Sequence, residues 1–352
     1  MKVLRRLWSV VLLITYYAGA FQLASTNKQP LFLSNKVSKV LSAGKTTTSL
    51  LMVTPSVFLP GPETVIGTVG RGYISILIAK LAAHRSHGKS WIICPSAEIE
   101  LMRQLAAVDS FGTQLENLEL VPASDTNRIE ALLGETQALM LGVDDVDSVV
   151  DSSIVEYLLD PAKVGKIRRV VAMSRNLNGS GMGVFVSASK RAANAQVWDN
   201  SQRDAYEKFE ENVKNAAKSC EANWTIFRAG TLKGGACGEN NVYSQYLSES
   251  FYEMTKSDIV TWQLLFDCNV RGVKLVKGDV LPGPGMKAVF TATGTEEHEG
   301  DTSRGGIAEA MVRSLEFEGL ENIDFGVGTV ASRDPPSDDE WKALFSSCLA
   351  IT

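Results

Sequence analysis

No aspartate or glutamate occurs before Glu63 in this chain of 352 residues, although seven lysines and arginines do. Subtracting those seven from the 35 basic residues leaves 28 basic against 40 acidic residues in the rest, a net charge of −12. A body of that charge has no overall field to attract DNA or RNA, because nucleic-acid binding depends on neutralising phosphates. We therefore expect no nucleic-acid partner.

Cysteine and histidine are scarce, which argues against several kinds of site. The five cysteines are odd in number and scattered, with no Cys-x-x-Cys pair, so the sequence indicates neither a disulfide framework nor a zinc site. The three histidines, His84, His87 and His298, show no ligand spacing. No P-loop and no Ser-His-Asp set is visible, and we predict no metal site.

The first 52 residues have the composition of a targeting address. Residues 1–20 combine basic residues at the start, an apolar run from Leu7 to Tyr17 and a small-residue end, which is the layout of a secretory signal peptide. The apolar run is short for a bilayer span, so we expect no transmembrane segment in the mature chain. Residues 21–52 are acid-free and rich in Ser, Thr and Lys, which is typical of a transit peptide.

With Phe21 at their junction, these two segments resemble the bipartite plastid-targeting presequence of diatoms and related algae. The resemblance implies import into the plastid stroma. The alternative is a secreted protein with a linker, in which Asn178-Gly179-Ser180 would be a glycosylation site. The scattered cysteines favour the plastid over the secreted alternative.

From Ser56 onward, short apolar runs alternate with amphipathic stretches, a pattern typical of βαβ units around a parallel sheet. The pattern predicts an α/β fold, a doubly wound parallel-sheet Rossmann fold over residues 53–332. Residues 234–300 are expected to form a small C-terminal substrate lobe over the sheet edge, and residues 333–352 a C-terminal tail and helix. Six strands are predicted at Ser56–Leu59, Trp91–Cys94, Leu118–Pro122, Ala138–Gly142, Arg169–Ser174 and Trp224–Arg228. Helices are predicted at Tyr73–His84, Ala97–Ala107, Arg128–Leu133, Ser153–Leu159 and Asp204–Cys220. Later elements are predicted at Tyr243–Thr255, Gly272–Val276, Ala288–Thr293, Arg304–Glu316, Asp324–Val327 and from Glu340.

The stretch between the first predicted strand and the first predicted helix is rich in glycine. Glycines there let the backbone approach a pyrophosphate, whose charge is met by amides at the helix N-terminus. Gly67 and Gly70 fit the first two glycines of G-x-x-G-x-x-G, but Tyr73 stands at the third. The alternative is a merely flexible loop. The candidate cofactor-binding residues of this stretch are Gly61, Gly67, Gly70, Arg71 and Gly72.

The end of the second strand normally determines which dinucleotide is bound. An acid there would accept from a ribose hydroxyl, and an arginine would meet a 2′-phosphate. Neither stands at that place in Pro95-Ser96-Ala97-Glu98, where Ser96 is the candidate contact. The missing acid favours NADP(H) over NAD(H). After the third strand, Asp125 would either accept from an adenine amino group or cap the next helix.

Two stretches carry a family resemblance. Trp224–Leu232 is similar to the sixth-strand motif T-I-[VI]-R-P-G-x-L of the atypical short-chain dehydrogenase/reductase superfamily, which includes NmrA-like and plastid NAD(P)-binding proteins; Ala229 replaces the proline. Asp301–Glu309 is similar to the late helix start of that group, with Gly306 where an aspartate usually stands. The resemblance covers residues 56–327 and implies a Rossmann fold, bound NAD or NADP, and a cofactor-binding role for Arg228.

Catalytic members of that group use a serine after the fifth strand and a Tyr-x-x-x-Lys helix, whose lysine lowers the tyrosine pKa for proton exchange with the substrate. Ser174 and Tyr206 match the serine and the tyrosine, but Glu210 stands at the lysine position. An anion there raises the pKa of a tyrosine. Lys208 lies about 200° around the helix from Tyr206 and is a poor substitute.

Two functions therefore stay open. The first is an NADP(H)-dependent oxidoreductase of the plastid that acts on a small hydrophobic or carbonyl substrate through Ser174 and Tyr206. The second, which the resemblance also implies, is a non-catalytic dinucleotide-binding scaffold or assembly factor for photosystems or plastid gene expression. Glu210 favours the second, and the retained serine and tyrosine favour the first.

Overall fold

The computed structural model describes nine parts of the chain. They are residues 60–86, 88–106, 116–143, 152–177, 203–233, 272–280, 301–330, 332 and 335–349. All of them belong to the compact unit that spans residues 56–352.

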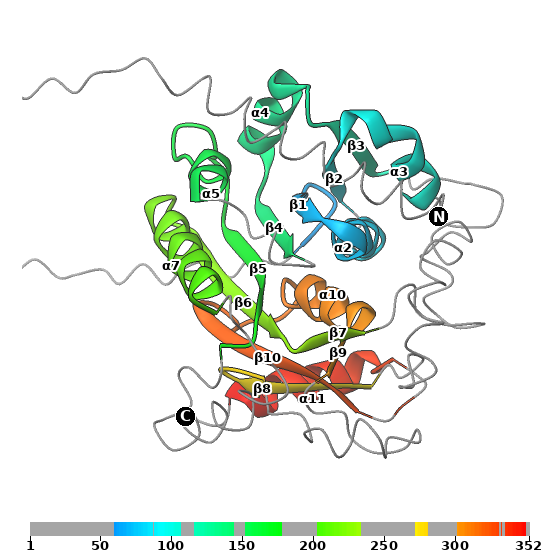
Figure 1. Ribbon diagram of the computed structural model, residues 1–352, viewed down its shortest axis with the longest axis vertical. Helices are drawn as coiled ribbons and strands as arrows, with labels where there is room; N and C mark the ends of the chain where they lie inside the picture. The colour runs from blue at the N-terminus through cyan, green and yellow to red at the C-terminus, as the bar shows by residue number, and fades with distance from the viewer. Residues whose placement is uncertain are drawn as a thin grey trace, which may run out of the picture. The chain divides into compact units, whose positions relative to one another are not determined.

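An eight-stranded sheet forms the centre of this unit, in the order β3-β2-β1-β4-β5-β6-β10-β8 (Figure 1). Neighbouring strands are parallel throughout, except that β8 runs antiparallel to β10. The strands are β1 (Val65–Arg71), β2 (Lys89–Cys94), β3 (Leu118–Pro122), β4 (Ala138–Val143), β5 (Arg169–Arg175), β6 (Asn223–Ala229), β8 (Gly272–Lys277) and β10 (Ile323–Val330). A second, two-stranded parallel sheet pairs β7 (Thr231–Lys233) with β9 (Asp301–Ser303). The order 3-2-1-4-5-6 of the first six strands is that of the doubly wound Rossmann fold, so the predicted fold class is confirmed.

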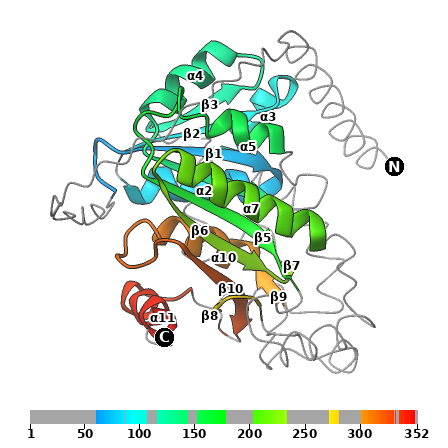
Figure 2. The same ribbon diagram turned by 90° about the vertical axis from the view of Figure 1, so that its left-hand side faces the viewer.

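Helices cover both faces of the sheet (Figure 2). One core lies under α2 (Gly72–Ser86), α3 (Ile99–Ala106), α10 (Arg304–Arg313) and α11 (Asp338–Leu349). The other lies under α4 (Thr126–Glu135), α5 (Ser152–Leu158) and α7 (Arg203–Ser219). The short 3-10 helix η1 (Ser96–Glu98) precedes α3. Among the described helices, none is both long enough and apolar enough to span a membrane.

Alternating side chains of the central strands supply the two cores. On β5, Val171 and Met173 face α2 and α10, while Val170 and Ala172 face α5 and α7. This burial on both faces is expected of a parallel sheet, whose strands read as near-continuous apolar runs.

The C-terminal helix α11 completes the first core through aromatic contacts. Phe345 packs against Phe325 of β10 with ring centroids 5.9 Å apart, and against Trp341 at 5.8 Å. Phe325 in turn stacks on Phe227 of β6 at 5.3 Å. The last helix is thus part of the main core.

Two expectations from the sequence differ from the structure. Most of the stretch 61–72 is not a loop: after a turn at residues 61–64, β1 occupies Val65–Arg71 and α2 follows directly, so that prediction is wrong. Because glycine is uncommon inside strands, the glycines of this stretch led to the prediction of a loop in place of β1. Gly272–Lys277, expected in the lobe, instead forms β8 at the edge of the main sheet. The predicted strand Ser56–Leu59, helix Tyr243–Thr255 and strand Ala288–Thr293 lie outside the described residues.

Candidate functional site

The strand order reverses between β1 and β4, which places a topological switch point at their carboxyl ends. Ligands of doubly wound folds bind in the crevice at this point. Gly70 of β1 is paired with Gly142 of β4, and Arg71 with Val143. The two strands therefore present bare backbone side by side, next to the start of α2 (Figure 1).

Close packing explains the glycines around this crevice. A Cβ atom on Gly70 would lie 1.8 Å from the carbonyl oxygen of Gly142, and its φ of +154° also disfavours a side chain. A Cβ on Gly142 would lie 3.1 Å from Ile78 and 3.4 Å from the Cα of Ser75, both in α2. A Cβ on Gly67 would lie 2.4 Å from the Trp91 ring. In Rossmann folds one glycine permits close packing of the helix on the strand; here Gly142 does so from β4.

The first helix begins at Gly72, without a connecting loop after β1. Its first turn contains no acidic residue, so nothing there neutralises the positive end of the helix dipole or repels a phosphate. Gly61 lies elsewhere: it precedes β1, where its N–H donates to Oγ1 of Thr64 at 2.7 Å, at the amino edge of the sheet. The structure thus places Gly70, Arg71 and Gly72 at the carboxyl end of β1, at the switch point, and Gly61 at the opposite edge of the sheet.

The ends of β2 and β3 are joined by a pair of serines. Ser96 donates from Oγ to Oγ of Ser124 at 2.8 Å and accepts from the Ser124 N–H at 3.2 Å. Asp125 caps α4, accepting from the backbone N–H of Arg128 at 3.0 Å. Of the two roles considered for Asp125, the structure shows the cap.

Arg128 itself forms a two-bonded pair with Glu119 on β3, at 2.6 and 2.8 Å. Hydrogen bonding to Arg128 is the largest of several effects that lower the pKa of Glu119. Glu119 lies near the start of β3 and also pairs with Lys89 at the start of β2, at 3.1 Å, so this carboxylate draws the Arg128 guanidinium toward the amino ends of these strands.

Ser174 and Tyr206 lie on the same side of the sheet, the side that α7 covers. Ser174 is next to last in β5, fully buried, and its Oγ has no hydrogen-bond partner in the described structure. Tyr206 is buried in the first turns of α7, among side chains that pack on β5 and β6. The two candidates of the dehydrogenase/reductase pattern thus occupy the expected elements.

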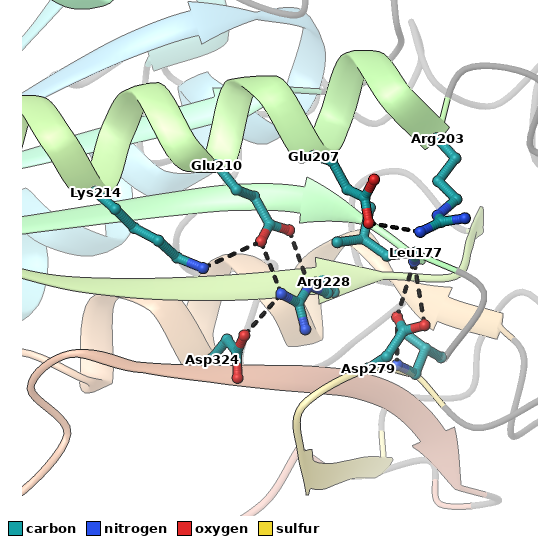
Figure 3. Close-up of polar contacts among 9 residues, drawn as sticks. Leu177, Arg203, Glu207, Glu210, Lys214, Arg228, Asp279 and Asp324 are labelled. Carbon is teal, nitrogen blue, oxygen red and sulfur yellow. Dashed lines mark hydrogen bonds and ion pairs between the residues drawn. The ribbon is translucent and has the colours of Figure 1, made fainter. Parts of the chain in front are cut away.

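The lysine position of that pattern is occupied by half of a buried ion pair. Glu210 of α7 accepts two hydrogen bonds from Arg228 of β6, from Nε at 2.8 Å and from Nη2 at 2.7 Å (Figure 3). The two side chains are only 3% and 4% exposed. Nη2 of Arg228 also bonds Asp324 of β10 at 2.7 Å, and Nζ of Lys214 lies 3.6 Å from Glu210.

The environment of Arg228 favours its charged form despite burial. Desolvation, the largest single effect, opposes the charge. The hydrogen bonds and charge of Glu210, with the charges of Asp324 and Asp279, together outweigh it and raise the pKa of Arg228. Arg228, which the resemblance suggested as a cofactor contact, bonds Glu210 and Asp324 through Nε and Nη2, while its buried Nη1 has no hydrogen-bond partner among the described residues.

Sequence reasoning missed Glu210 as a partner for Arg228, together with Asp324 and Asp279. One signal was present: Glu210 falls on the apolar stripe of α7 with Phe209 and Val213. A charged residue on such a stripe is rarely buried unless it is paired. The apolar stripe does not indicate which strand carries the partner of Glu210, because the choice of strand depends on how α7 packs on the sheet.

Metal chemistry receives no support from the described residues, which contain no group of three or more His, Cys, Asp or Glu side chains placed to hold an ion. The candidate ligand-contacting parts of the structure are the side chains of Ser174 and Tyr206 and the backbone around Gly70. These features define a class: a doubly wound α/β protein whose strand order reverses between β1 and β4.

Comparisons with known proteins find low similarity only. No family model matches the chain, and no curated protein matches its sequence. Among solved structures, Gre2 from Candida albicans is 13% identical, with a TM-score of 0.45, over 76% of this chain and 79% of that one. The anaerobillin reductase ChuY from Escherichia coli O157:H7 is 10% identical, with a TM-score of 0.42, over 78% and 100%. UDP-glucuronic acid 4-epimerase from Bacillus cereus, solved with NAD, is 10% identical, with a TM-score of 0.42, over 76% and 79%. At this similarity, the strand order of the chain itself defines its fold.

Proposed function

We propose that this chain is a nicotinamide-dinucleotide-binding protein of the atypical dehydrogenase/reductase kind, with NADP(H) preferred, and that it acts without a tyrosine–lysine proton relay. The observation that carries the proposal is the buried pair of Glu210 with Arg228, which occupies the lysine position. Such a protein would serve as a dinucleotide-dependent scaffold or assembly factor.

The residues at the crevice fit a dinucleotide. The amides at the start of α2 would hold the pyrophosphate, and the bare backbone at Gly70 and Gly142 leaves room beside them. The Ser96 hydroxyl, in place of an acid at the end of β2, would not repel a 2′-phosphate. The buried, unpartnered Oγ of Ser174 is available to the other half of the ligand. A bound nicotinamide would supply hydride chemistry.

The proton side of that chemistry is what this chain lacks. In the usual arrangement a lysine beside the tyrosine stabilises the phenolate and so lowers its pKa. Here the side chain one turn after Tyr206 is the carboxylate of Glu210, whose charge is matched by Arg228. No positive charge is gained for the tyrosine at that position, which supports a binding role over turnover.

An oxidoreductase is the second candidate, and one observation favours it. A buried hydroxyl without a partner, such as that of Ser174, costs stability, and a ligand that completed its hydrogen bonding would offset this cost. A substrate carbonyl oxygen would do so. The two candidates differ in whether bound NADPH is consumed.

Thermal unfolding of the purified full-length chain tests the binding claim. A ligand specific to the folded state stabilises it by RT ln(1 + [L]/Kd), or about 2.7 kcal/mol at 100 Kd. We expect a higher melting temperature with NADPH than with NADH at equal concentration. An unchanged melting temperature with both at millimolar concentration would refute dinucleotide binding.

A consumption assay then separates the two candidates. NADPH absorbance is followed with a panel of aldehydes, ketones, quinones and activated olefins, using the wild type and Tyr206→Phe. The scaffold proposal expects no consumption by either protein. Turnover by the wild type that is lost in Tyr206→Phe would establish the oxidoreductase instead.

Location in the plastid stroma is also proposed, on the composition of residues 1–52. Import would remove both predicted segments, so the mature protein is expected to start well after Phe21. Mass spectrometry of the N-terminus in isolated plastids and in the medium tests this. A mature N-terminus at Phe21 in the medium would show secretion.

A further inference from the structure

The chain makes a sharp turn where it leaves the edge strand β8. Gly278, Asp279 and Val280 follow this strand, and we call them the strap. Gly278 adopts φ of +92°, a conformation that favours glycine, and its N–H donates to the carbonyl of Asp324 at 3.0 Å. The turn directs the strap off the edge and across the neighbouring strand.

The strap crosses β10 on the side that α7 covers. A Cβ atom on Gly326 of β10 would lie 2.5 Å from the carbonyl carbon of Asp279 and 2.5 Å from the nitrogen of Val280. Gly326 is the register partner of Arg228 on β6, and residues in register share a face of the sheet. The strap therefore lies beside the buried network of Arg228 and depends on the bare backbone of Gly326.

The side chain of Asp279 reaches the end of β5. The carboxylate is fully buried and accepts from the Leu177 N–H with both oxygens, each at 3.1 Å, and from the Val280 N–H at 2.8 Å (Figure 3). Leu177 lies three residues beyond Ser174. One side chain thus ties the outer edge of the sheet to the strand end that carries the unpartnered serine.

The hydrogen bonds between Asp279 and Leu177 lie in one particular half of the fold. A doubly wound sheet consists of two mononucleotide-binding halves, and a dinucleotide lies across both. The crevice at Gly70 and the start of α2 belong to the first half, formed by β1 to β3. The strap bonds the segment just beyond β5, which belongs to the second half.

We propose that Asp279 is a positioning residue for the second mononucleotide half of the site: it holds the end of β5 in the geometry that receives the nicotinamide side of the ligand. This inference rests on the proposed dinucleotide binding. It assigns Asp279 no contact with the ligand.

Calorimetric titration of the full-length chain with two probes tests the proposal. One probe is NADPH, which fills both halves, and the other is adenosine 2′,5′-bisphosphate, which carries only the adenosine half of NADPH. Asp279→Ala is expected to weaken NADPH binding about tenfold, equivalent to about 1.4 kcal/mol, and to change the Kd of the bisphosphate less than about twofold. General destabilisation of the fold would not produce this split.

Two further variants keep the test decisive if Asp279→Ala does not fold. Gly326→Ala displaces the strap while leaving its side chains intact, and should show the same split. Asp279→Asn keeps one oxygen to accept from the Leu177 N–H, and should recover part of the NADPH affinity. The control is Glu316→Gln, which removes the charge of a half-buried carboxylate bonded to Arg85 at 2.7 Å and should change neither Kd.

Each outcome decides the matter. Cooperatively folded Asp279→Ala, Asp279→Asn and Gly326→Ala variants with wild-type affinity for NADPH would overturn the positioning role, as would equal weakening for both probes. Failure of the wild type to bind either probe would overturn the proposed function itself, and the positioning role with it.

Discussion

Replacing Arg228 by methionine is the most informative perturbation of the buried network. The substitution leaves the carboxylate of Glu210, 3% exposed, with Lys214 at 3.6 Å as its nearest cation. Removing one partner of a buried pair costs about 3–5 kcal/mol, because the remaining charge is left desolvated. Asp324 is better solvated, at 28% exposed, and adds less to this cost.

Urea denaturation of Arg228→Met, Glu210→Leu and the double variant measures this cost and its origin. The double variant removes both charges and replaces them with apolar side chains, so it should be more stable than Arg228→Met alone. The coupling energy is the stability change of the double variant minus the sum of the changes of the two single variants, and it reaches about 0.5–3 kcal/mol for residues in contact. For the same reason Glu210→Lys, which would restore the residue of the catalytic pattern, should be destabilising, because it sets two cations side by side.

A matched pair nearer the surface provides the control. Arg128 and Glu119 are bonded in the same two-bond geometry, but their side chains are 41% and 30% exposed. Arg128→Met should therefore destabilise the fold much less than Arg228→Met, because solvent screens this pair. If Arg228→Met costs no more than Arg128→Met, the network is not a buried structural pair, and the argument against a catalytic relay at position 210 loses its basis.

Three other perturbations test separate parts of the structure. Burial lowers the pKa of Lys80 from 10.5 to about 7, so the unfolded chain holds one more proton than the folded chain between these two values. The free energy of unfolding of the wild type should therefore rise between pH 7 and pH 9, by up to about 1.4 kcal/mol per pH unit more than that of Lys80→Met, when both are measured by urea denaturation. Phe345→Ala removes the ring that joins α11 to Phe325, and should lower the unfolding free energy by about 3–5 kcal/mol in the same assay; a loss below about 1 kcal/mol would show that α11 is not part of the core. Gly70→Ala places a Cβ 1.8 Å from the carbonyl of Gly142 and should separate β1 from β4, seen as loss of the cooperative melt; a wild-type melt would contradict the close approach.

Local patterns in the sequence were enough to predict most elements. The runs Ala138–Gly142 and Arg169–Ser174 match β4 and β5 because buried parallel strands are continuous apolar segments between polar turns. The Asp125 cap was one of the two roles proposed from its place before α4. These features depend on neighbours in sequence, so sequence reasoning reaches them.

The glycine-rich stretch shows where local patterns fail. Gly67 and Gly70 read as loop residues, yet both lie in the central strand β1. Their lack of a side chain is required by the Trp91 ring of β2 and the carbonyl of Gly142 in β4, which come from elsewhere in the chain. Strand propensity carries no information about such neighbours.

The sequence by itself determined the fold class, the strand and the helix that carry Ser174 and Tyr206, and the absence of lysine at position 210, because each follows from the order and periodicity of residues. Only the tertiary structure decided what Glu210 does. It packs against β6, where Arg228 has no water to solvate its charge, and burial makes the pairing of the two obligatory. The tertiary structure also decided the role of Asp279. Asp279 and its partner Leu177 are 102 residues apart in sequence and meet only because β8 joins the main sheet.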